Sequence, residues 1–310
     1  MRAQLSAWGL GGAARRFLGI RLGRLHQYSP KPMSIAEIAL PGEGGPMPRI
    51  SLVTPSFNQV RFVGKTLESV LGQGYPDLEY FVQDACSTDG SVEVIRGNDG
   101  RGVTISIERD SGQADALNRG FAKASGEVMG YLNSDDLLLP GMLHRVGAYF
   151  RDHPEVDVVY GNRLIVDDEG REIGRWILPG HDGDLLRYVD YVPQESMFWR
   201  RRVWERAGAR FDEQMHFAMD WELILRFLDA GAVFRHTPDL LGVFRVHGDQ
   251  KSQASFMARG VREMAALRLR FGGLSAGPVR RLLRHGRYLW AHRVADAEFE
   301  KNLSKRIELK

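Results

Sequence analysis

Short apolar runs alternate with helically spaced apolar residues between positions 50 and 132, and this alternation limits the fold more than any other feature of the sequence. The strand-like runs are residues 50–53, 78–82, 103–107 and 128–132. Helical spacing appears between them, first at Val63, Leu67 and Val70. Strands that alternate with helices are typical of an α/β fold, so we expect a mostly parallel central sheet flanked by helices.

The pattern changes after residue 155. A strand is expected at residues 156–160, and the turn signal at residues 167–170 predicts a hairpin. Two late strands are expected at residues 233–236 and 241–246, and from about residue 256 the chain is helical and rich in arginine. We therefore predict a basic N-terminal extension and linker, one α/β domain and a helical C-terminal extension, with bounds at residues 1–47, 48–255 and 256–310.

The charge is distributed unevenly along the chain. Residues 1–31 contain six basic residues and no acidic ones, and residues 258–310 contain 13 basic and five acidic residues. The formal net charge of +3 then leaves −11 for residues 32–257. A nucleic-acid-binding domain would carry its basic stripe on the folded core, so no nucleic-acid partner is expected. The basic ends could contact an anionic membrane surface, or they could be solvated or form an oligomer contact.

The single cysteine, Cys86, excludes an internal disulfide framework, and a reducing cytoplasm is the simplest setting for such a chain. Residues 3–14 are the longest uncharged run near the N terminus. This run is too short for a membrane span, and its polar residues and glycines make a poor export signal. We expect a cytoplasmic protein. If its basic ends bind a membrane, they would hold it peripherally at the inner membrane face.

Polar segments follow three of the strands, at residues 55–58, 84–89 and 133–136. Because ligands bind beyond the carboxyl ends of parallel strands, these segments should converge on one crevice. Asp135 and Asp136 are adjacent carboxylates whose repulsion a divalent cation would relieve, and oxygen ligands suit Mn²⁺ or Mg²⁺. The alternative is that Asp136 or Ser134 caps a helix that begins near Pro140.

Other polar residues have two readings each. Asp84 either binds a base or ribose or lies in a solvated turn. Asp115 and Asn118 share one helix face, and they either line the crevice or cap and solvate the first turn. The aromatic stretch at residues 191–199 either shapes an acceptor pocket or belongs to the core.

Two further candidates lie near the end of the predicted domain. Asp220 and Glu222 begin a helix and point to roughly opposite sides of it, so only one can face the crevice. We expect this to be Asp220, with Glu222 solvated, although Asp220 could merely interact with the helix dipole. His247 follows a strand, where a lone histidine is more often structural or exposed than a ligand.

Six motifs occur in a fixed order. They are residues 50–58 (ISLVTPSFN), 84–91 (DACSTDGS), 111–120 (SGQADALNRG), 126–136 (GEVMGYLNSDD), 219–226 (MDWELILR) and 247–252 (HGDQKS). Their order and spacing closely resemble the inverting family 2 of glycosyltransferases, over about residues 48–252. The resemblance implies the GT-A fold, in which a Rossmann-like nucleotide-binding half is joined to an acceptor half.

The resemblance also implies a role for each matching position. Thr54, Pro55, Asn58 and Asp84 match positions that hold the nucleoside, and residues 111–120 place Asp115 and Asn118 on the donor side. Asp136 matches the metal ligand of the acidic DXD motif, and Asp135 would assist at the ribose or the metal. Asp220 matches the catalytic base. His247 matches a histidine often placed near the metal or diphosphate.

The implied activity is metal-dependent transfer, with inversion, of a sugar from a nucleotide-diphosphate sugar, expected to be a UDP-sugar, to an acceptor hydroxyl. The acceptor would be a glycan or a lipid-linked molecule, in cell-surface polysaccharide or glycolipid synthesis. Asn133, Met219 and the Ala85-Cys86 pair depart from the residues common in the family. The processive pattern Gln-x-x-Arg-Trp is not found in the sequence, which favours transfer of a single sugar.

Rival functions predict other sequences. A sugar-1-phosphate nucleotidyltransferase should have a glycine-rich loop after the first strand, but residues 54–58 contain no glycine. A non-catalytic GT-A scaffold should have lost the acidic pair or the base, and both are present. A nicotinamide-dependent dehydrogenase should have Gly-x-Gly-x-x-Gly after strand one, which this chain lacks.

Overall fold

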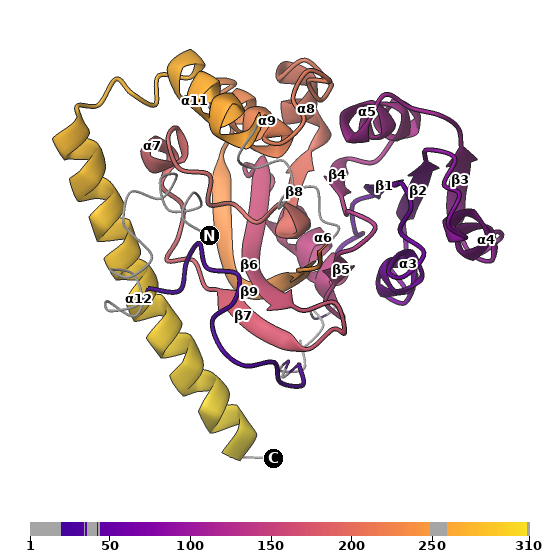
Figure 1. Ribbon diagram of the computed structural model, residues 1–310, viewed down its shortest axis with the longest axis horizontal. Coiled ribbons are helices and arrows are strands. Elements are labelled where there is room, and N and C mark those ends of the chain that lie inside the picture. The colour runs from indigo at the N-terminus through magenta and orange to yellow at the C-terminus, as the bar shows by residue number, and fades with distance from the viewer. Residues whose placement is uncertain (1–19, 34, 36–41, 43, 249–258, 309–310) are drawn as a thin grey trace.

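The first half of the central sheet is parallel in the computed structural model, which describes residues 20–33, 35, 42, 44–248 and 259–308. Its strands are β1 (Ile50–Ser56), β2 (Leu78–Asp84), β3 (Val103–Ile107) and β4 (Val128–Tyr131). They lie in the order β3-β2-β1-β4, and every pairing among them is parallel (Figure 1). The predicted strand and helix alternation is therefore confirmed here.

Helices cover both faces of this half. They are α3 (Val63–Leu71), α4 (Ser91–Arg96) and α5 (Gln113–Lys123). Successive β1 residues face different cores, since Leu52 packs with the α3 residue Val63, and Val53 packs with the α5 residue Leu117. All seven residues of β1 are buried, including the polar residues Ser51, Thr54 and Ser56, because helices cover both faces of the strand.

The second half of the sheet is mixed. Its strands are β5 (Leu137–Leu138), β6 (Val158–Val166), β7 (Glu172–Trp176), β8 (Met197–Arg200) and β9 (Phe234–Arg245). β8 lies between β4 and β6 and is antiparallel to both, while β6 pairs with β9 in parallel and with β7 as the predicted hairpin. The sheet is thus mainly parallel only in its first half.

The two late strands predicted near the end of the domain are one continuous strand, β9. The prediction of a break between residues 236 and 241 was wrong, because the strand continues through Pro238. The pairing of β9 with β6 instead shifts register on both sides of Asn162, and this irregularity accommodates the proline.

The remaining helices lie outside the sheet. They are α6 (Met142–Asp152), α7 (Gly183–Leu186), the 3₁₀ turn η1 (Gln194–Ser196), α8 (Arg201–Arg206), α9 (Met219–Asp229), α11 (Val261–Arg270) and α12 (Pro278–Glu308). The expected helical C-terminal region is confirmed by α11 and α12, and α12 runs along the outside of the molecule (Figure 1). Within the described ranges, no helix combines the length and apolar character that crossing a membrane requires.

Residues 20–33, which fall within the predicted N-terminal extension, pack against β7 and α12. Gln27 exchanges two hydrogen bonds with the backbone of Arg175, at 2.8 and 3.1 Å. Leu22 is fully buried, and its backbone N–H donates to Nε2 of His292 at 3.0 Å. The rest of the basic N-terminal end, residues 1–19, lies outside the described residues.

The contact through His292 predicts a loss of stability in acid. Its Nδ1 lies 2.6 Å from the carbonyl of Ile177, so both ring nitrogens are occupied when the ring is neutral. Burial lowers the pKa of His292 to about 4. The unfolded chain binds a proton at this position below about pH 6.5. Between these two values the unfolded state binds more protons than the folded state, so the free energy of unfolding falls as the pH falls.

His292→Gln should remove part of this pH dependence, because glutamine does not titrate. Between pH 7 and pH 4.5, we expect the free energy of unfolding to fall less in the variant than in the parent chain, by on the order of 2 kcal/mol. Urea unfolding at a series of pH values measures this difference. Equal slopes against pH in the two proteins would contradict the prediction.

Candidate functional site

The loops after β1 and β2 are joined by hydrogen bonds at the carboxyl edge of the sheet. The N–H of Asn58 donates to Oγ of Ser87 at 2.8 Å, and the N–H of Thr88 donates to Oδ1 of Asn58 at 3.0 Å. Asn58 has a φ of 52°, a left-handed conformation that asparagine tolerates better than most residues. The two polar segments therefore lie side by side, as the strand order predicted.

Three of the predicted nucleoside-binding residues, Thr54, Pro55 and Asp84, have buried side chains. Asp84 is 1% exposed, and its carboxylate accepts hydrogen bonds from the N–H and Oγ of Ser87 at 2.8 and 2.7 Å. The hydroxyl of Thr54 lies in the core, 2.9 Å from that of Tyr80, and Pro55 is also buried. The side chains of Thr54 and Pro55 therefore lie in the core, and Asp84 orients the turn that follows β2.

Asp115 and Asn118 bind other parts of the protein. Oδ2 of Asp115 accepts a hydrogen bond from the N–H of Ser111 at 2.9 Å, and Oδ1 accepts one from Arg119 at 2.8 Å. Asn118 exchanges two hydrogen bonds with the backbone of Phe211, at 2.7 and 3.1 Å. These contacts favour the capping alternative for Asp115, and they give Asn118 the role of anchoring the segment that leads to α9.

Asp110 is a partly buried acid of the same region that the sequence reasoning missed. Burial raises the pKa of Asp110, and the charges of Asp115 and Asp84 raise it further. The N–H of Gly112 donates to its Oδ1 at 2.9 Å. The sequence signal that could have identified Asp110 was its position just after strand β3 and before Gly112, the residue that precedes α5.

The acidic pair lies between β4 and β5. Asp136 is 1% exposed, and its Oδ1 accepts a hydrogen bond from the backbone N–H of Arg245 at 3.0 Å. Arg245 also donates from Nε to the carbonyl of Asp135 at 2.9 Å. Asp136 does not cap the next helix, because the N-cap of α6 is Gly141. Burial raises the pKa of Asp136 well above its usual value, and the charges of Asp135 and Glu195 add to this effect.

His247 contacts Asp135 of the acidic pair, although the two residues are 112 positions apart in the sequence. Its Nε2 lies 3.0 Å from Oδ2 of Asp135, and its ring centroid lies 4.6 Å from that of Phe62. His247 is 5% exposed, and its Nδ1 is buried without a hydrogen-bond partner among the described residues. The ring therefore contacts the acidic pair through Nε2 and Asp135, and Nδ1 is the ring nitrogen that would be available to a cation.

The described residues contain no group of three or more His, Cys, Asp or Glu side chains already arranged to hold a metal ion. The available donors are the carboxylates of Asp135 and Asp136 and the imidazole of His247, a set that suits Mn²⁺ or Mg²⁺. Their accumulated negative charge and the unpartnered Nδ1 of His247 both fit a bound cation.

A second group of acids approaches the same strand end from the other side. Burial raises the pKa of Tyr131, the last residue of β4, well above its usual value. The charges of Asp220, Asp136, Asp190 and Glu195 raise it further, in that order. Four carboxylates from three segments, with Asp190 and Glu195 on the same one, therefore lie within electrostatic range of one side chain.

Asp220 lies in the first turn of α9 and remains partly exposed. Its Oδ1 accepts a hydrogen bond from the N–H of Trp221 at 2.8 Å. Burial raises the pKa of Asp220 despite this hydrogen bond and the nearby charge of Arg163. A carboxyl group with a raised pKa is a stronger base once it is ionised, which suits it to accept a proton.

Asp190 neighbours Asp220, and the sequence reasoning missed it. Burial raises the pKa of Asp190 well above its usual value, and the charge of Asp220 raises it further. Arg163 and Arg268 act in the opposite direction. The aromatic residues that follow Asp190 drew attention in the sequence, but Trp199 is fully buried and Tyr191 is 1% exposed, so the core interpretation of that stretch is correct for them.

Glu195 and Arg163 form a buried ion pair beside these acids. Nε and Nη2 of Arg163 donate to the two carboxylate oxygens of Glu195 at 2.8 and 2.6 Å. The guanidinium lies 4.6 Å from the ring centroids of both Trp176 and Phe244. The pair therefore places a fixed positive charge next to Asp220 and Asp190.

Amide side chains connect the two sides of the site. Nε2 of Gln113 donates to Oδ1 of Asn133 at 2.7 Å, and Nδ2 of Asn133 donates to Oε1 of Gln194 at 3.2 Å. Gln194 in turn donates to the carbonyl of Tyr131 at 2.7 Å. The departure from the family pattern at Asn133 is thus part of a bridge between the start of α5 and η1.

Glu222 was predicted to be solvated, and this was wrong. It is 1% exposed, and its carboxylate accepts hydrogen bonds from Nε of Arg226 at 2.9 and 3.0 Å. Arg270 of α11 lies 3.3 Å from it. Glu222 is buried because α11 packs on α9. The residues next to Glu222 in the sequence do not reveal this contact, because α11 lies about 40 positions further along the chain.

Among proteins of known sequence, the O-antigen biosynthesis protein RfbC of Myxococcus xanthus is 32% identical over 215 residues, which are 67% of this chain and 16% of that protein. The chain therefore spans about one sixth of the length of RfbC. An uncharacterized glycosyltransferase of Nostoc sp. is 31% identical over 231 residues, which are 69% of this chain and 70% of that protein.

Solved structures share the fold. The first is Staphylococcus aureus TarS residues 1–349 in complex with UDP-GlcNAc, with a TM-score of 0.57 and 17% identity over 71% of this chain and 66% of that one. The second is the mannosyltransferase PcManGT of Pyrobaculum calidifontis in complex with GDP-Man and Mn²⁺. The TM-score is 0.54, and the identity is 20% over 94% of this chain and 80% of that one. These likenesses confirm the expected GT-A fold.

The matching family profile is described as Glycosyl transferase family 2, and it covers residues 51–227. This is more than half of the chain, and it contains the acidic pair, Asp220 and the buried ion pair. The protein belongs to glycosyl transferase family 2.

Proposed function

We propose that the protein transfers a single sugar from a nucleotide-diphosphate sugar to an acceptor hydroxyl, with inversion, during synthesis of cell-surface polysaccharide or glycolipid. The convergence of Asp136, Asp220, Asp190 and Glu195 around Tyr131 carries this proposal. In this proposal Asp136 would bind a diphosphate-bound cation and Asp220 would act as the base, both near the end of β4. The names of RfbC and of the structural neighbours are consistent with such a reaction.

The donor would lie on the first half of the sheet. Asn58 and Asp84 would contact the nucleoside directly or through the turn they form, with Thr54 and Pro55 contributing backbone groups. Asp115 and Asn118 would act on the donor side by fixing the loops around it. We propose a UDP-sugar as donor.

Asp136 and His247 would hold Mn²⁺ or Mg²⁺, and Asp135 would assist at the metal or the ribose. When bound, such an ion stabilises the negative charge that develops on the leaving diphosphate. Arg245 fixes the pair through hydrogen bonds to both residues, so the carboxylates keep their positions before the donor arrives.

Asp220 would take the proton from the acceptor hydroxyl as that oxygen attacks the sugar. Attack from the face opposite the leaving diphosphate inverts the anomeric centre in a single displacement. Arg163 would keep Asp220 ionised next to Asp190, because its charge opposes the effect of burial. A glycan or lipid-linked acceptor would therefore enter from the side of Asp190.

A cytoplasmic location with peripheral contact at the inner membrane face belongs to the same proposal. The lone cysteine, Cys86, is consistent with a reducing compartment. A sugar-1-phosphate nucleotidyltransferase is the alternative activity, and it would consume a nucleoside triphosphate and a sugar phosphate instead of a nucleotide sugar.

Calorimetric titration with UDP, GDP and dTDP, each with and without Mn²⁺, tests the donor site. We expect one nucleotide to bind, and to bind only with the metal. Asp136→Asn retains an acceptor for the N–H of Arg245 but removes the charge, so it should weaken binding by about 10- to 100-fold. Asp152→Asn, at a surface acid, is the matched control and should bind normally.

Each contrary outcome has its own meaning. If none of the three nucleotides binds under either condition, the donor-site proposal is wrong. If a nucleotide binds equally well without Mn²⁺, the metal role of Asp136 and His247 is wrong while the nucleoside site survives.

A further inference from the structure

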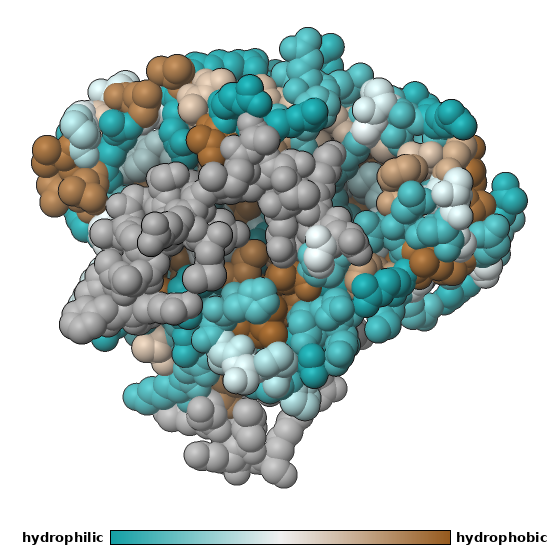
Figure 2. Space-filling view, in the orientation of Figure 1, coloured by the Kyte–Doolittle hydropathy of each residue, from teal (hydrophilic) through white to brown (hydrophobic). Residues whose placement is uncertain are grey.

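Exposed apolar side chains are concentrated on the C-terminal helices. The described residues include 11 large hydrophobic side chains that are exposed, and eight of them lie between positions 261 and 294. These eight are Val261, Leu269, Leu274, Val279, Leu282, Leu283, Trp290 and Val294. Figure 2 shows hydrophobic residues gathered where Figure 1 places α11 and the beginning of α12.

Five of these residues form one face of α12, which we call the outer face: Val279, Leu282, Leu283, Trp290 and Val294. Their spacing of i, i+3, i+4, i+11 and i+15 places them on the same side of a helix. The opposite side, including Tyr288, Leu289 and His292, is buried against the domain. A helix that is apolar on opposite sides is normally covered on both.

The outer face is also basic. From Val279 to Glu298 the exposed charged residues of α12 are Arg280, Arg287, Arg293 and Glu298, three basic residues and one acid, while Asp296 is only 6% exposed. The guanidinium of Arg293 lies 5.4 Å from the ring centroid of Trp290. Leucine and tryptophan side by side with arginine are typical of helices that lie in a membrane interface.

The charge argues against a protein copy as the occupant. In a two-fold dimer through this face, each chain would bury its arginines against a surface that carries the same excess of arginines. Residues 1–19 of the chain are also basic, with Arg2, Arg15 and Arg16 and no acid, so they offer no compensating charge. An anionic lipid surface supplies negative headgroups and an apolar layer at once.

We propose that the outer face of α12 docks on an anionic membrane, with its leucine and tryptophan side chains in the interface and its arginines on lipid phosphates. The face contains a hollow of about 520 Å³, lined in part by Leu282, Leu283, Arg287 and Trp290. Apolar walls beside an arginine suit a lipid, whose acyl chain and headgroup need both kinds of contact.

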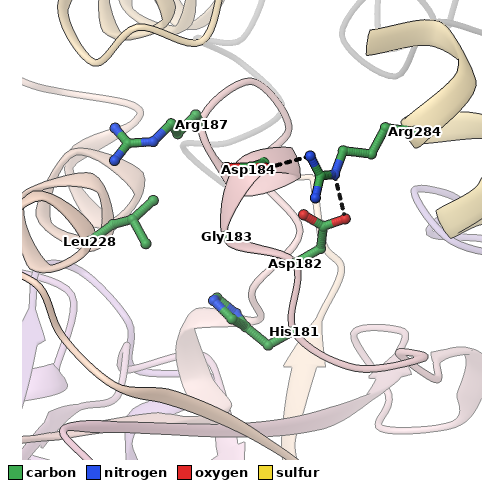
Figure 3. A pocket seen from close by; sticks show the side chains of 7 residues that line it. All are labelled: His181, Asp182, Gly183, Asp184, Arg187, Leu228 and Arg284. Atoms are coloured by element: carbon green, nitrogen blue, oxygen red, sulfur yellow. Dashed lines mark hydrogen bonds and ion pairs between the residues drawn. The ribbon is translucent and has the colours of Figure 1, made fainter. Parts of the chain in front are cut away.

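The buried side of α12 is fastened to the acceptor side of the site. Arg284 reaches from α12 to the carboxylates of Asp182, at 2.8 Å, and of Asp184, as Figure 3 shows. The hydroxyl of Tyr288 donates to the carbonyl of Gly180 at 3.0 Å, and its ring centroid lies 4.9 Å from that of Tyr191.

These contacts join α12 to the segment that carries Asp190. Docking would therefore bring the lipid surface close to the acceptor side, which fits a lipid-linked acceptor. This last step rests on the proposed function, whereas membrane binding by the outer face does not.

Sedimentation with lipid vesicles, in the absence of nucleotide, tests the docking surface in the full chain. We expect binding to vesicles of mixed phosphatidylcholine and phosphatidylglycerol, little binding to phosphatidylcholine alone, and weaker binding at high salt. Arg287→Gln combined with Arg293→Gln should weaken binding about thirtyfold, given the usual contribution of an arginine near an anionic surface.

Leu283→Gln combined with Trp290→Gln removes apolar contacts and should weaken binding by at least about tenfold. All four positions are exposed, so the fold should tolerate these changes. Matched controls away from the outer face are Arg96→Gln combined with Arg210→Gln, and Met33→Gln, each at an exposed position. Both controls should bind vesicles like the parent chain.

Three results would overturn the proposal. The parent chain could fail to bind mixed vesicles, or the outer-face variants could bind as tightly as the controls. Light scattering could instead show a lipid-free dimer that Leu283→Gln with Trp290→Gln dissociates, which would identify a second copy as the occupant. Because no nucleotide is present, a failure here leaves the donor-site result unaffected, and the reverse also holds.

Discussion

Asp220→Asn is expected to lower kcat by about 10²- to 10⁴-fold, the usual contribution of a positioned general base. The amide is nearly isosteric with the carboxylate and can still accept the hydrogen bond from the N–H of Trp221, so the start of α9 should persist. Nucleotide binding should be unchanged, because Asp136 and His247 lie on other segments. Release of nucleoside diphosphate from the sugar donor in the presence of acceptor measures the rate.

Asp229→Asn, at the exposed end of the same helix, is the matched control and should retain the parent rate. A variant at Asp220 that retains full activity would place the base elsewhere, and Asp190 would be the next candidate. The two candidates are separable. If Asp190 is the base, Asp220→Asn should remain active and Asp190→Asn should lose activity.

The pH profile adds a second readout of the same residue. The ionised form of Asp220 is the active base, so kcat/KM should fall as the pH falls through its pKa, which burial raises above the ordinary carboxyl value. The charge of Asp220 raises the pKa of Asp190, so Asp190 is still neutral when Asp220 ionises, and Asp190→Asn should leave the acidic limb in place. A limb that moves to lower pH in this variant would show that Asp190 is charged while Asp220 titrates.

Glu195→Ala is expected to lower the free energy of unfolding by about 3–5 kcal/mol. The side chains of Arg163 and Glu195 are 9% and 0% exposed, so the variant leaves a guanidinium buried between two aromatic rings without its counter-charge. Desolvation of an unpaired charge is the dominant cost. Chemical denaturation, followed by tryptophan fluorescence, measures the change.

Two comparisons isolate the effect of burial. Arg101→Ala breaks a pair with Glu68 in which both side chains are largely exposed, so it should lower the free energy of unfolding far less than Glu195→Ala does. Arg163→Met combined with Glu195→Leu removes both charges and should recover much of the lost stability. If Glu195→Ala were as mild as Arg101→Ala, the buried pair would not be stabilising the fold in the way its geometry indicates.

Local periodicity was a reliable guide where each segment forms its structure from its own residues. The run at residues 50–53 became β1, and the stripe of Val63, Leu67 and Val70 became the buried face of α3. The acidic pair follows β4 as expected, because a polar segment after a buried strand must emerge at its carboxyl end.

Periodicity was a poor guide where one segment depends on a distant one. Glu222 has the surroundings of a solvated helix residue until α11 covers it and Arg270 pairs with it. Pro238 resembles a strand end until the irregular pairing with β6 accommodates it. In both cases the deciding contact comes from residues tens of positions away.

The sequence by itself determined the alternating parallel half of the sheet, the family, and which loops carry Asp84, Asp136, Asp220 and His247. These features depend on spacing within short segments, and spacing is visible in one dimension. Only the tertiary structure decided that β8 lies antiparallel between β4 and β6, and that Asp190 and Glu195 join the acids around Tyr131. Burial and charge proximity are relations between distant segments, so they exist only once the chain has folded.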